Sequence, residues 1–153
     1  MDEVYSVEHE KDWAKSVNEI IIQKDIKNVF CFHIEAEIDS LFTYKKIEEP
    51  ADFISDDENY IGRSFEKYVK KINDFPDGFF DIVMVDGRAR PSCVFYSLHK
   101  IKVGGHLVLD NSDRSYYLAK NLPLFQKWTR QDFLGPVPSL EHFCMTTIFK
   151  RTL

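Results

Sequence analysis

The sequence predicts a single α/β domain with a mostly parallel sheet flanked by helices and an antiparallel hairpin at its C-terminal edge. The chain has 153 residues, of which 44% are apolar and 14% aromatic, enough for one hydrophobic core. Apolar runs of strand length alternate with segments of helical periodicity, as in parallel sheets whose strands are joined by helices. Two β-like stretches, 128–134 and 143–150, follow each other at the C-terminal end and favour an antiparallel pair.

The first third contains strand, helix, strand and then an irregular acidic excursion. Residues 4–7 alternate and are rich in β-formers, and Glu8 follows them. Residues 10–23 have an apolar stripe at helical spacing that includes Trp13, and residues 28–34 form the second strand. Residues 35–60 are acidic and weakly periodic, so we expect an irregular insertion within the one domain, which spans 1–153.

The remaining elements alternate regularly. The apolar run at 79–86 has the length and composition of a strand covered on both faces. The sequence predicts helices over 60–72, 91–102 and 116–122, and a buried strand over 106–109. Gly104 and Gly105 suit the C-terminal end of the helix predicted over 91–102 and the tight turn that follows it.

Composition excludes several classes of protein. The 25 acids and 20 bases give a net charge of −5, which argues against nucleic-acid binding driven by bulk charge, and the aromatic content argues against disorder. Residues 1–60 carry a net charge of −10 and residues 61–153 a net charge of +5. This asymmetry could steer an anionic ligand or simply reflect solvated faces.

We see no membrane span or secretory signal and expect a cytoplasmic protein. The three cysteines lack zinc-site spacing and are expected to be buried free thiols.

Polar residues follow three of the predicted strands. Glu8, Asp86, Asp110 and Asn111 should share one rim, because ligands gather at the carboxyl ends of parallel strands. Asp86, Asp110 and Asn111 offer the hard oxygen ligands that suit Mg²⁺ or another divalent cation. The alternative is that the two aspartates cap helices or brace loops.

Two further features of the rim have two interpretations each. Glu8 could accept the hydroxyls of a nucleoside ribose, or it could stabilise the N-terminus of the helix that follows. Arg88, Arg90 and Arg114 could bind a substrate carboxylate or phosphate, or they could neutralise neighbouring acids.

The segments 4–8, 79–90 and 102–111 resemble those of class I S-adenosylmethionine-dependent methyltransferases. The resemblance implies a Rossmann-like fold, S-adenosylmethionine as cofactor, Glu8 as the ribose-binding acid and Asp86 as a cofactor-binding and catalytic residue at the rim. In the cation-dependent O-methyltransferases of this family, the metal is held by an Asp followed by an Asp-Asn pair, which Asp86, Asp110 and Asn111 match. The resemblance therefore implies methyl transfer to an oxygen of a small molecule, with or without assistance by a divalent metal. The net charge and the lack of a long apolar run predict no nucleic-acid or membrane partner.

One departure from the family pattern is clear. The first strand and its glycine-rich loop should precede the strand ending at Glu8, yet there is no G-x-G and no glycine before Gly62. Three alternatives follow: the chain is an N-terminally incomplete fragment, it closes the gap by rearrangement or by pairing with another chain, or it is a degenerate relative. A non-catalytic binding or assembly module is therefore the competing function, with a homo-oligomer as its expected assembly. A dehydrogenase half, another nucleoside-binding domain, has less support because it also needs the glycine loop.

The acceptor pocket is not defined by the sequence. Aromatic side chains near the predicted rim could line a substrate pocket or could belong to the core. They are Tyr116, Tyr117, Trp128 and Phe133.

Overall fold

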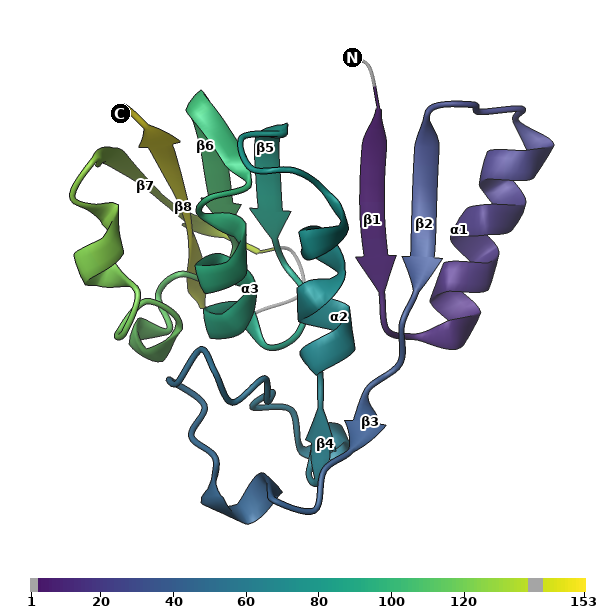
Figure 1. Cartoon of the computed structure of the whole chain (residues 1–153), viewed down its shortest axis with the longest axis horizontal. Helices are drawn as coiled ribbons and strands as arrows, with labels where there is room; N and C mark the ends of the chain where they lie inside the picture. Colours follow the sequence, from purple (N-terminus) through teal and green to yellow (C-terminus); the bar gives the residue numbers. More distant parts are fainter. Residues whose placement is uncertain (1–2, 138–141) are drawn as a thin grey trace.

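The computed structural model describes residues 3–137 and 142–153 and confirms the mixed α/β architecture (Figure 1). Its larger sheet has four strands in the order β5-β6-β8-β7, with β5 and β6 parallel and the other pairs antiparallel. The predicted C-terminal hairpin is therefore present at the sheet edge. The strands are β5 (Phe80–Val85), β6 (Ile101–Leu109), β7 (Trp128–Pro136) and β8 (Phe143–Arg151).

A second sheet consists of two parallel strands, β1 (Val4–Glu8) and β2 (Val29–His33), connected by helix α1 (Lys11–Gln23). Strands β1, β2 and β5 run in the same direction and end at the same side of the molecule (Figure 1). Among the described residues, no backbone pairing joins β1 to β5. Their facing edges lie where the resemblance predicts a further central strand.

Aromatic side chains bring the two sheets together. The ring centroid of Tyr5 on β1 lies 4.6 Å from that of Phe75 and 6.3 Å from that of Phe80 on β5. Phe75 in turn packs on Phe80 at 4.9 Å. Side-chain packing, rather than strand pairing, therefore connects β1 to β5.

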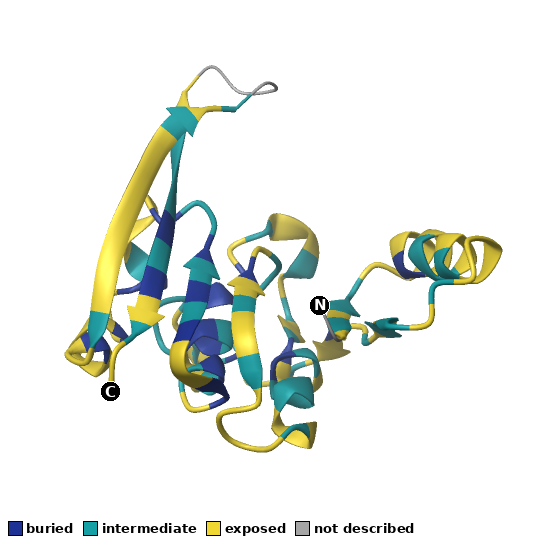
Figure 2. Cartoon of the chain, turned by 90° about the horizontal axis from the view of Figure 1, so that it is seen from above, coloured by how far each residue is buried: buried dark blue, intermediate teal, exposed yellow. Residues whose placement is uncertain are grey.

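Helix α3 (Arg90–Ser97) covers one face of the four-stranded sheet, and α2 (Glu66–Lys70) lies beside α3 on the side toward β1 (Figure 1). Val94 of α3 belongs to the same buried cluster as Leu107 and Phe149, and Phe149 stacks on Phe125 with ring centroids 4.0 Å apart. Figure 2 shows that β6 and β8 are the most buried strands of this sheet, whereas β7 is exposed along most of its length.

The opposite face of β5 is open, so the prediction that this strand is covered on both faces is wrong. Ile82 and Met84 are 61% and 62% exposed. They alternate with Val83 and Val85, which face the core. On α1 the expected apolar stripe is also largely exposed, and Ala14 is the residue that is buried.

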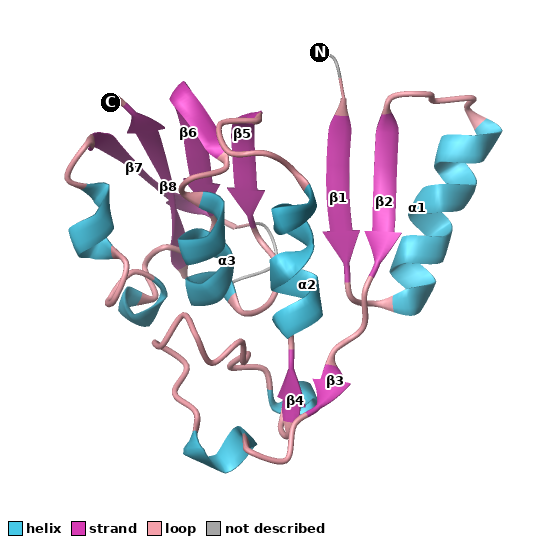
Figure 3. Cartoon of the chain, viewed as in Figure 1, coloured by secondary structure: helices cyan, strands magenta, loops and turns pink. Residues whose placement is uncertain are grey.

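The segment between β2 and α2 is irregular, as predicted. It contains the two-residue strands β3 (Glu37–Ile38) and β4 (Arg63–Ser64), which pair with each other, and short 3₁₀ turns at Phe42–Tyr44 and Glu58–Tyr60. Figure 3 shows it as mostly loop, lying below the carboxyl ends of β1 and β5. Phe53 anchors this excursion by packing in a second core cluster with Phe65 and Val69.

Three predicted helices are shorter than their apolar spacing suggested. The helix expected over 60–72 begins at Glu66, because Gly62 adopts φ +78° and β4 follows it, and a 3₁₀ turn (Lys71–Asp74) ends it. The segment 116–122 contains no α-helix; 3₁₀ turns occupy Ser115–Tyr117 and Leu122–Phe125. Helix α3 ends at Ser97 and not at 102, because β6 already begins at Ile101.

Gly104 and Gly105 lie within β6 and not at a helix end. The register between β5 and β6 shifts between Phe80 and Ile82, so the glycines lie at a bulge. A Cβ atom on Gly105 would lie 2.7 Å from the carbonyl oxygen of Asp81 and 2.8 Å from Cγ2 of Ile101. Glycine is required here for close approach of two strands.

Two predictions from composition can be compared with the structure. Within the described residues, no helix has the length and apolar character needed to cross a bilayer. Cys31, Cys93 and Cys144 are free and partly buried. Burial raises the pKa of the Cys93 thiol to about 12, so this thiol is protonated and unreactive near neutral pH.

We expect Gly105→Ala to lower the free energy of unfolding by about 1–3 kcal/mol, because the added methyl group must displace backbone. Gly135→Ala is the matched control, since a Cβ there meets nothing within 4 Å. Its stability should be unchanged or raised by up to about 1 kcal/mol. Urea denaturation followed by circular dichroism measures both. Equal stability of the two variants would contradict the close approach at Gly105.

Candidate functional site

The predicted rim residues of the larger sheet come together at the ends of two neighbouring strands. Asp86 follows β5, and Asp110 and Asn111 follow β6. The strands pair in parallel through Val85 and Leu109, and the backbone N–H of Asp110 donates to the carbonyl of Val85 at 3.1 Å. The predicted convergence of these side chains is therefore present.

Arg90 occupies the centre of this group. Its Nε donates to the carbonyl oxygen of Gly87 at 3.0 Å. Its Nη1 donates to the carbonyl oxygen of Asp110 and to Oδ1 of Asn111, and its Nη2 donates to both the carbonyl oxygen and Oδ1 of Asp86. A guanidinium has five N–H donors, and here each has its own acceptor. In this arrangement all five donors of Arg90 are used within the protein, and its role in substrate binding stays a prediction.

The turns around Arg90 carry backbone strain. Ala89 has φ +47° and Asn111 has φ +48°, both in the left-handed region that non-glycine residues seldom adopt. Helix α3 begins at Arg90, directly after Ala89, with Pro91 in its first turn. Strain of this kind persists only where surrounding contacts fix the backbone, and it is concentrated at functional sites.

Asp86 and Asp110 form a coupled acidic pair. Burial raises the pKa of Asp86 above its ordinary value, and the hydrogen bond and charge of Asp110 raise it further, while Arg90 opposes the shift. Oδ1 of Asp110 accepts a hydrogen bond from Thr146 at 2.8 Å, and its Oδ2 lies 3.9 Å from Nη1 of Arg90. Asp86 is the more exposed of the pair and is the carboxylate best placed to meet a ligand at the rim.

The predicted metal site does not fit the observed contacts while Arg90 is in place. Oδ1 of Asp86 and Oδ1 of Asn111 both accept from the guanidinium and so are not directed at a common metal position. No group of three or more His, Cys, Asp or Glu side chains in the described ranges could hold a metal ion. Metal binding by Asp86, Asp110 and Asn111 is not confirmed.

Glu8 lies at the end of β1, as predicted, and braces the turn into α1. Its Oε1 accepts the backbone N–H groups of His9 at 2.7 Å and Glu10 at 2.8 Å. The same oxygen lies 2.9 Å from Nδ1 of His9. These contacts match the interpretation of Glu8 as an acid at a helix N-terminus, and they fix the orientation of its carboxylate.

His9 is a rim residue that sequence reasoning missed. Its ring is 11% exposed and packs edge-on against Tyr60, Phe65 and Tyr68. Its Nε2 is buried without a hydrogen bond among the described residues, and burial lowers the pKa of this imidazole. A neutral ring that donates from Nδ1 to Glu8 leaves Nε2 as an acceptor directed into the protein. No spacing in the sequence distinguishes His9 from a surface histidine.

Tyr68 connects the Glu8 end of the rim to the Asp86 end. Its ring centroid lies 6.1 Å from that of His9. A Cβ atom placed on Gly87 would lie 2.2 Å from the Tyr68 hydroxyl oxygen, so a larger residue there would require the Tyr68 side chain to move. The two sheets are thereby in contact just below their strand ends.

Comparison with solved structures identifies the architecture. An O-methyltransferase from Bacillus cereus, determined in complex with SAH, superposes with a TM-score of 0.64 over 98% of this chain at 10% identity. A putative O-methyltransferase from Klebsiella pneumoniae gives 0.63 over 99% at 10% identity, and an rRNA methylase from Streptococcus thermophilus gives 0.59 over 99% at 12% identity. The chain has the class I methyltransferase fold.

The superposition covers only part of each methyltransferase. The chain spans 63% of the length of the Bacillus cereus protein, 62% of the Klebsiella pneumoniae protein and 74% of the Streptococcus thermophilus protein. No protein-family model and no curated protein sequence matches the chain.

Two further arginines of this methyltransferase fold pair with the acidic excursion. Nη2 of Arg88 lies 2.6 Å from Oδ2 of Asp57, and Nη1 of Arg114 donates to Oδ2 of Asp56 at 3.1 Å. The hydroxyl of Tyr116 donates to the same Asp56 oxygen. The opposite charges of the two halves of the chain are thus partly matched within the molecule.

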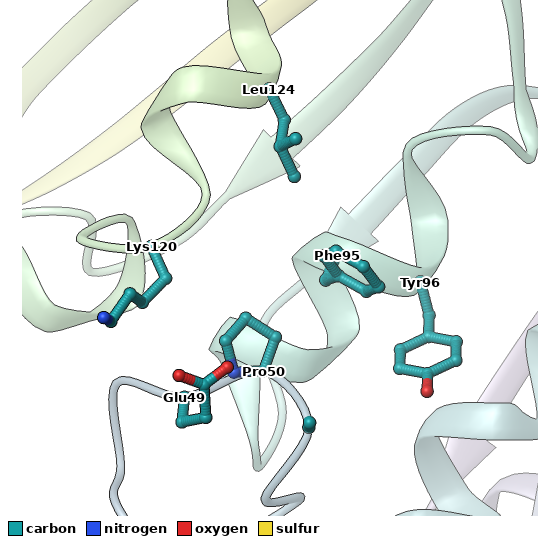
Figure 4. A pocket seen from close by; sticks show the side chains of 7 residues that line it. Glu49, Pro50, Phe95, Tyr96, Lys120 and Leu124 are labelled. Carbon is teal, nitrogen blue, oxygen red and sulfur yellow. The ribbon is translucent and has the colours of Figure 1, made fainter.

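The four aromatic residues that could either line a pocket or belong to the core lie largely in the core. Tyr117 is buried in the main cluster, against which Tyr116 and Trp128 pack, whereas Phe133 is 47% exposed on β7. A separate hollow of about 280 Å³ lies between the excursion and α3 (Figure 4). It is lined by Glu49, Pro50, Ala51, Phe95, Tyr96, Lys120 and Leu124. None of the predicted rim residues borders it, so its position gives no support for a substrate site at the rim.

Proposed function

We propose that the chain is the nucleoside-binding part of an S-adenosylmethionine-dependent methyltransferase that acts on an oxygen of a small molecule. The observation that carries the proposal is the class I methyltransferase fold with Glu8 and Asp86 at the ends of strands that finish on the same side of the molecule. The structural neighbours include both O-methyltransferases and an rRNA methylase, so their acceptors differ. We favour a small molecule over RNA because the chain carries a net charge of −5.

The residues around Glu8 fit the ribose of the cofactor. Within the described part of the chain, the hydrogen bonds of Glu8 all use Oε1, which leaves Oε2 to accept ribose hydroxyls. Because two backbone N–H groups fix Oε1, the direction of Oε2 is set before a ligand arrives. Asp86 lies further along the same rim.

The chain contains no glycine-rich loop for the methionine end of the cofactor, so full activity requires that this loop be supplied by other residues or be dispensable.

When bound, S-adenosylmethionine supplies a methyl group on a sulfonium, and the protein must align the acceptor oxygen with it. Asp86 is the candidate base for the acceptor hydroxyl, since burial raises its pKa and its carboxylate is half-exposed at the rim. The excursion lies below the strand ends (Figure 3). An anionic substrate would reach Arg88 or Arg114 by exchanging with Asp57 or Asp56.

Metal assistance is a separate part of the proposal. It requires Asp86 and Asn111 to be released from Arg90, with which both form hydrogen bonds in the structure. Methyl transfer that continues at full rate after chelation of divalent cations would argue against it.

We expect Glu8→Gln to weaken binding of S-adenosylhomocysteine by about 10- to 100-fold, because hydrogen bonds to a charged acceptor are replaced by bonds to a neutral amide. The amide oxygen can still accept the N–H groups of His9 and Glu10, so α1 should remain folded. Glu19→Gln on the exposed surface of the same helix is the control and should bind like the wild type. Isothermal titration calorimetry measures the affinity of the wild type and of both variants for S-adenosylhomocysteine. Equal binding by Glu8→Gln and wild type removes Glu8 from this role, and no binding by wild type contradicts the proposed function for this chain.

The second candidate function is a binding or assembly module, and the unpaired facing edges of β1 and β5 favour it. With Ile82 and Met84 exposed on the open face of the sheet, a second copy could cover this surface. We expect the chain to self-associate and Met84→Lys to shift it toward monomer. Ile38→Lys, on the excursion, is the control. Size-exclusion chromatography with light scattering measures the mass, and a wild-type chain that stays monomeric up to high concentration would rule this candidate out.

A further inference from the structure

We propose that the outer edge of β7 binds a second copy of this chain, with the two β7 strands antiparallel and related by a twofold axis at Gln131. The contact would join the two four-stranded sheets into one continuous sheet. It lies at the edge of the sheet opposite β5, so it is separate from the open face around Ile82 and Met84. The inference does not depend on cofactor binding or methyl transfer.

The outer edge of β7 is long, regular and open. Within the part of the chain that the structure describes, β7 pairs only with β8, over its whole length and without a shift in register. Every residue from 129 to 134 is exposed, and Figure 2 shows the strand at the border of the molecule. Soluble proteins usually protect such edges with a bulge, a lysine or a proline inside the strand. Strand β7 has no bulge and no lysine, and its one proline, Pro136, is its last residue, so another strand can pair along this edge.

The charges on β7 select a second copy of the same strand as the partner. Arg130 and Asp132 lie on one face of the strand, with Nε of Arg130 2.9 Å from Oδ1 of Asp132. Directly opposite residues of antiparallel strands share a face, so a twofold axis between identical strands must pass through a residue. With Gln131 on the axis, Arg130 of each copy lies opposite Asp132 of the other. With Arg130 or Asp132 on the axis, like charges would lie opposite each other, which favours the register centred on Gln131.

Both charged side chains keep groups available for this pairing. Among the described residues, Arg130 donates a hydrogen bond only from Nε, and Asp132 accepts only at Oδ1, from Arg130 and from Oγ1 of Thr147 at 2.6 Å. These two bonds lower the pKa of the Asp132 carboxyl below its ordinary value, so its charge is retained at neutral pH. The Nη groups of one copy can therefore donate to Oδ2 of the other. Since both side chains project from a face of the sheet, they stay in contact with water.

The same register also gives the exposed apolar residues of β7 partners. Phe133 and Leu134 are 47% and 68% exposed. With Gln131 on the axis, Phe133 lies opposite Thr129 of the second copy, and Leu134 lies opposite Trp128 of the second copy. Pairs of an aromatic residue with a β-branched or another apolar residue stabilise neighbouring strands, and the twofold axis repeats each pair. Backbone pairing, charge and apolar contacts therefore agree on one register.

Disulfide cross-linking of single introduced cysteines tests this register. Directly opposite Cα atoms in antiparallel strands are about 4.5–5.5 Å apart, within the range of a disulfide. Gln131→Cys should therefore give a disulfide-linked dimer under mild oxidation. Thr129→Cys is the matched control on the same face of β7, because its two copies would lie about 14 Å apart. On a non-reducing gel we expect at least about fivefold more dimer from Gln131→Cys than from Thr129→Cys, above the wild-type background from the three native cysteines.

Charge reversal tests the complementarity. Arg130→Glu places an acid opposite Asp132 of the second copy and should weaken the dimer at least about fivefold in sedimentation equilibrium. Asp132→Lys places a base opposite Arg130 and should weaken it similarly. A mixture of the two variants has opposite charges at every position and should associate more tightly than either variant alone. Lys127→Glu, directly before β7, is the control for charge reversal and should dimerise like the wild type.

Three results would overturn the proposal. They are a wild-type chain that stays monomeric at millimolar concentration, equal cross-linking of Gln131→Cys and Thr129→Cys, and no association in a mixture of Arg130→Glu and Asp132→Lys that circular dichroism shows to be folded. If Asp132→Lys does not fold, the cross-linking decides.

Two further results separate this contact from the other proposals. Adding Met84→Lys to Gln131→Cys should leave the cross-link unchanged, and its loss would assign the contact to the open face and overturn the proposal. A chain that cross-links at Gln131→Cys but binds no S-adenosylhomocysteine supports the β7 contact and contradicts only the proposed function.

Discussion

The ends of β5 and β6 are joined by one side chain, Arg90, and the arrangement of the rim depends on it. Its five hydrogen bonds connect the turn after β5 with the turn after β6 and neutralise part of the charge of two carboxylates. Hydrogen bonds that involve a charged group are worth about 1.5–3 kcal/mol each, enough to hold two non-glycine residues in left-handed conformation at about 1–3 kcal/mol each. The positions of Asp86 and Asn111 depend on these bonds together with the parallel pairing of β5 with β6, which continues to Val85 and Leu109.

The Glu8 end of the rim is built differently. Strand β1 is not paired with β5, so its position depends on Tyr5 packing against Phe75 and Phe80 at one end, and on His9 and Tyr68 at the other. The acidic excursion closes the same edge through ion pairs of Asp56 and Asp57 with arginines of the C-terminal half. The charge asymmetry of the sequence is therefore part of the tertiary structure and not only a property of solvated surfaces.

Much of the fold could be predicted from the sequence, because buried strands and strand-end carboxylates have clear local patterns. The run ending at Asp86, the strand ending at Asp110 and the C-terminal hairpin are all present. Helix lengths were overestimated where apolar spacing continued past a feature that stops a helix, such as Gly62 with φ +78°. The bonds of Arg90 could not be predicted, since three of its acceptors are backbone carbonyls whose directions depend on turn geometry. His9 was missed because only packing around its ring makes it unusual.

The most direct test of the central constraint is a ¹H–¹⁵N spectrum of the arginine side chains of the wild-type chain. A guanidinium fixed by five hydrogen bonds should show separate Nη proton signals and an Nε proton that exchanges slowly with water. Arg130 is half-exposed and, within the described ranges, bonds only to Asp132, so it should show averaged and rapidly exchanging signals. The account predicts that Arg90 gives resolved, protected signals at neutral pH. Averaged Arg90 signals that exchange as fast as those of Arg130 would contradict it.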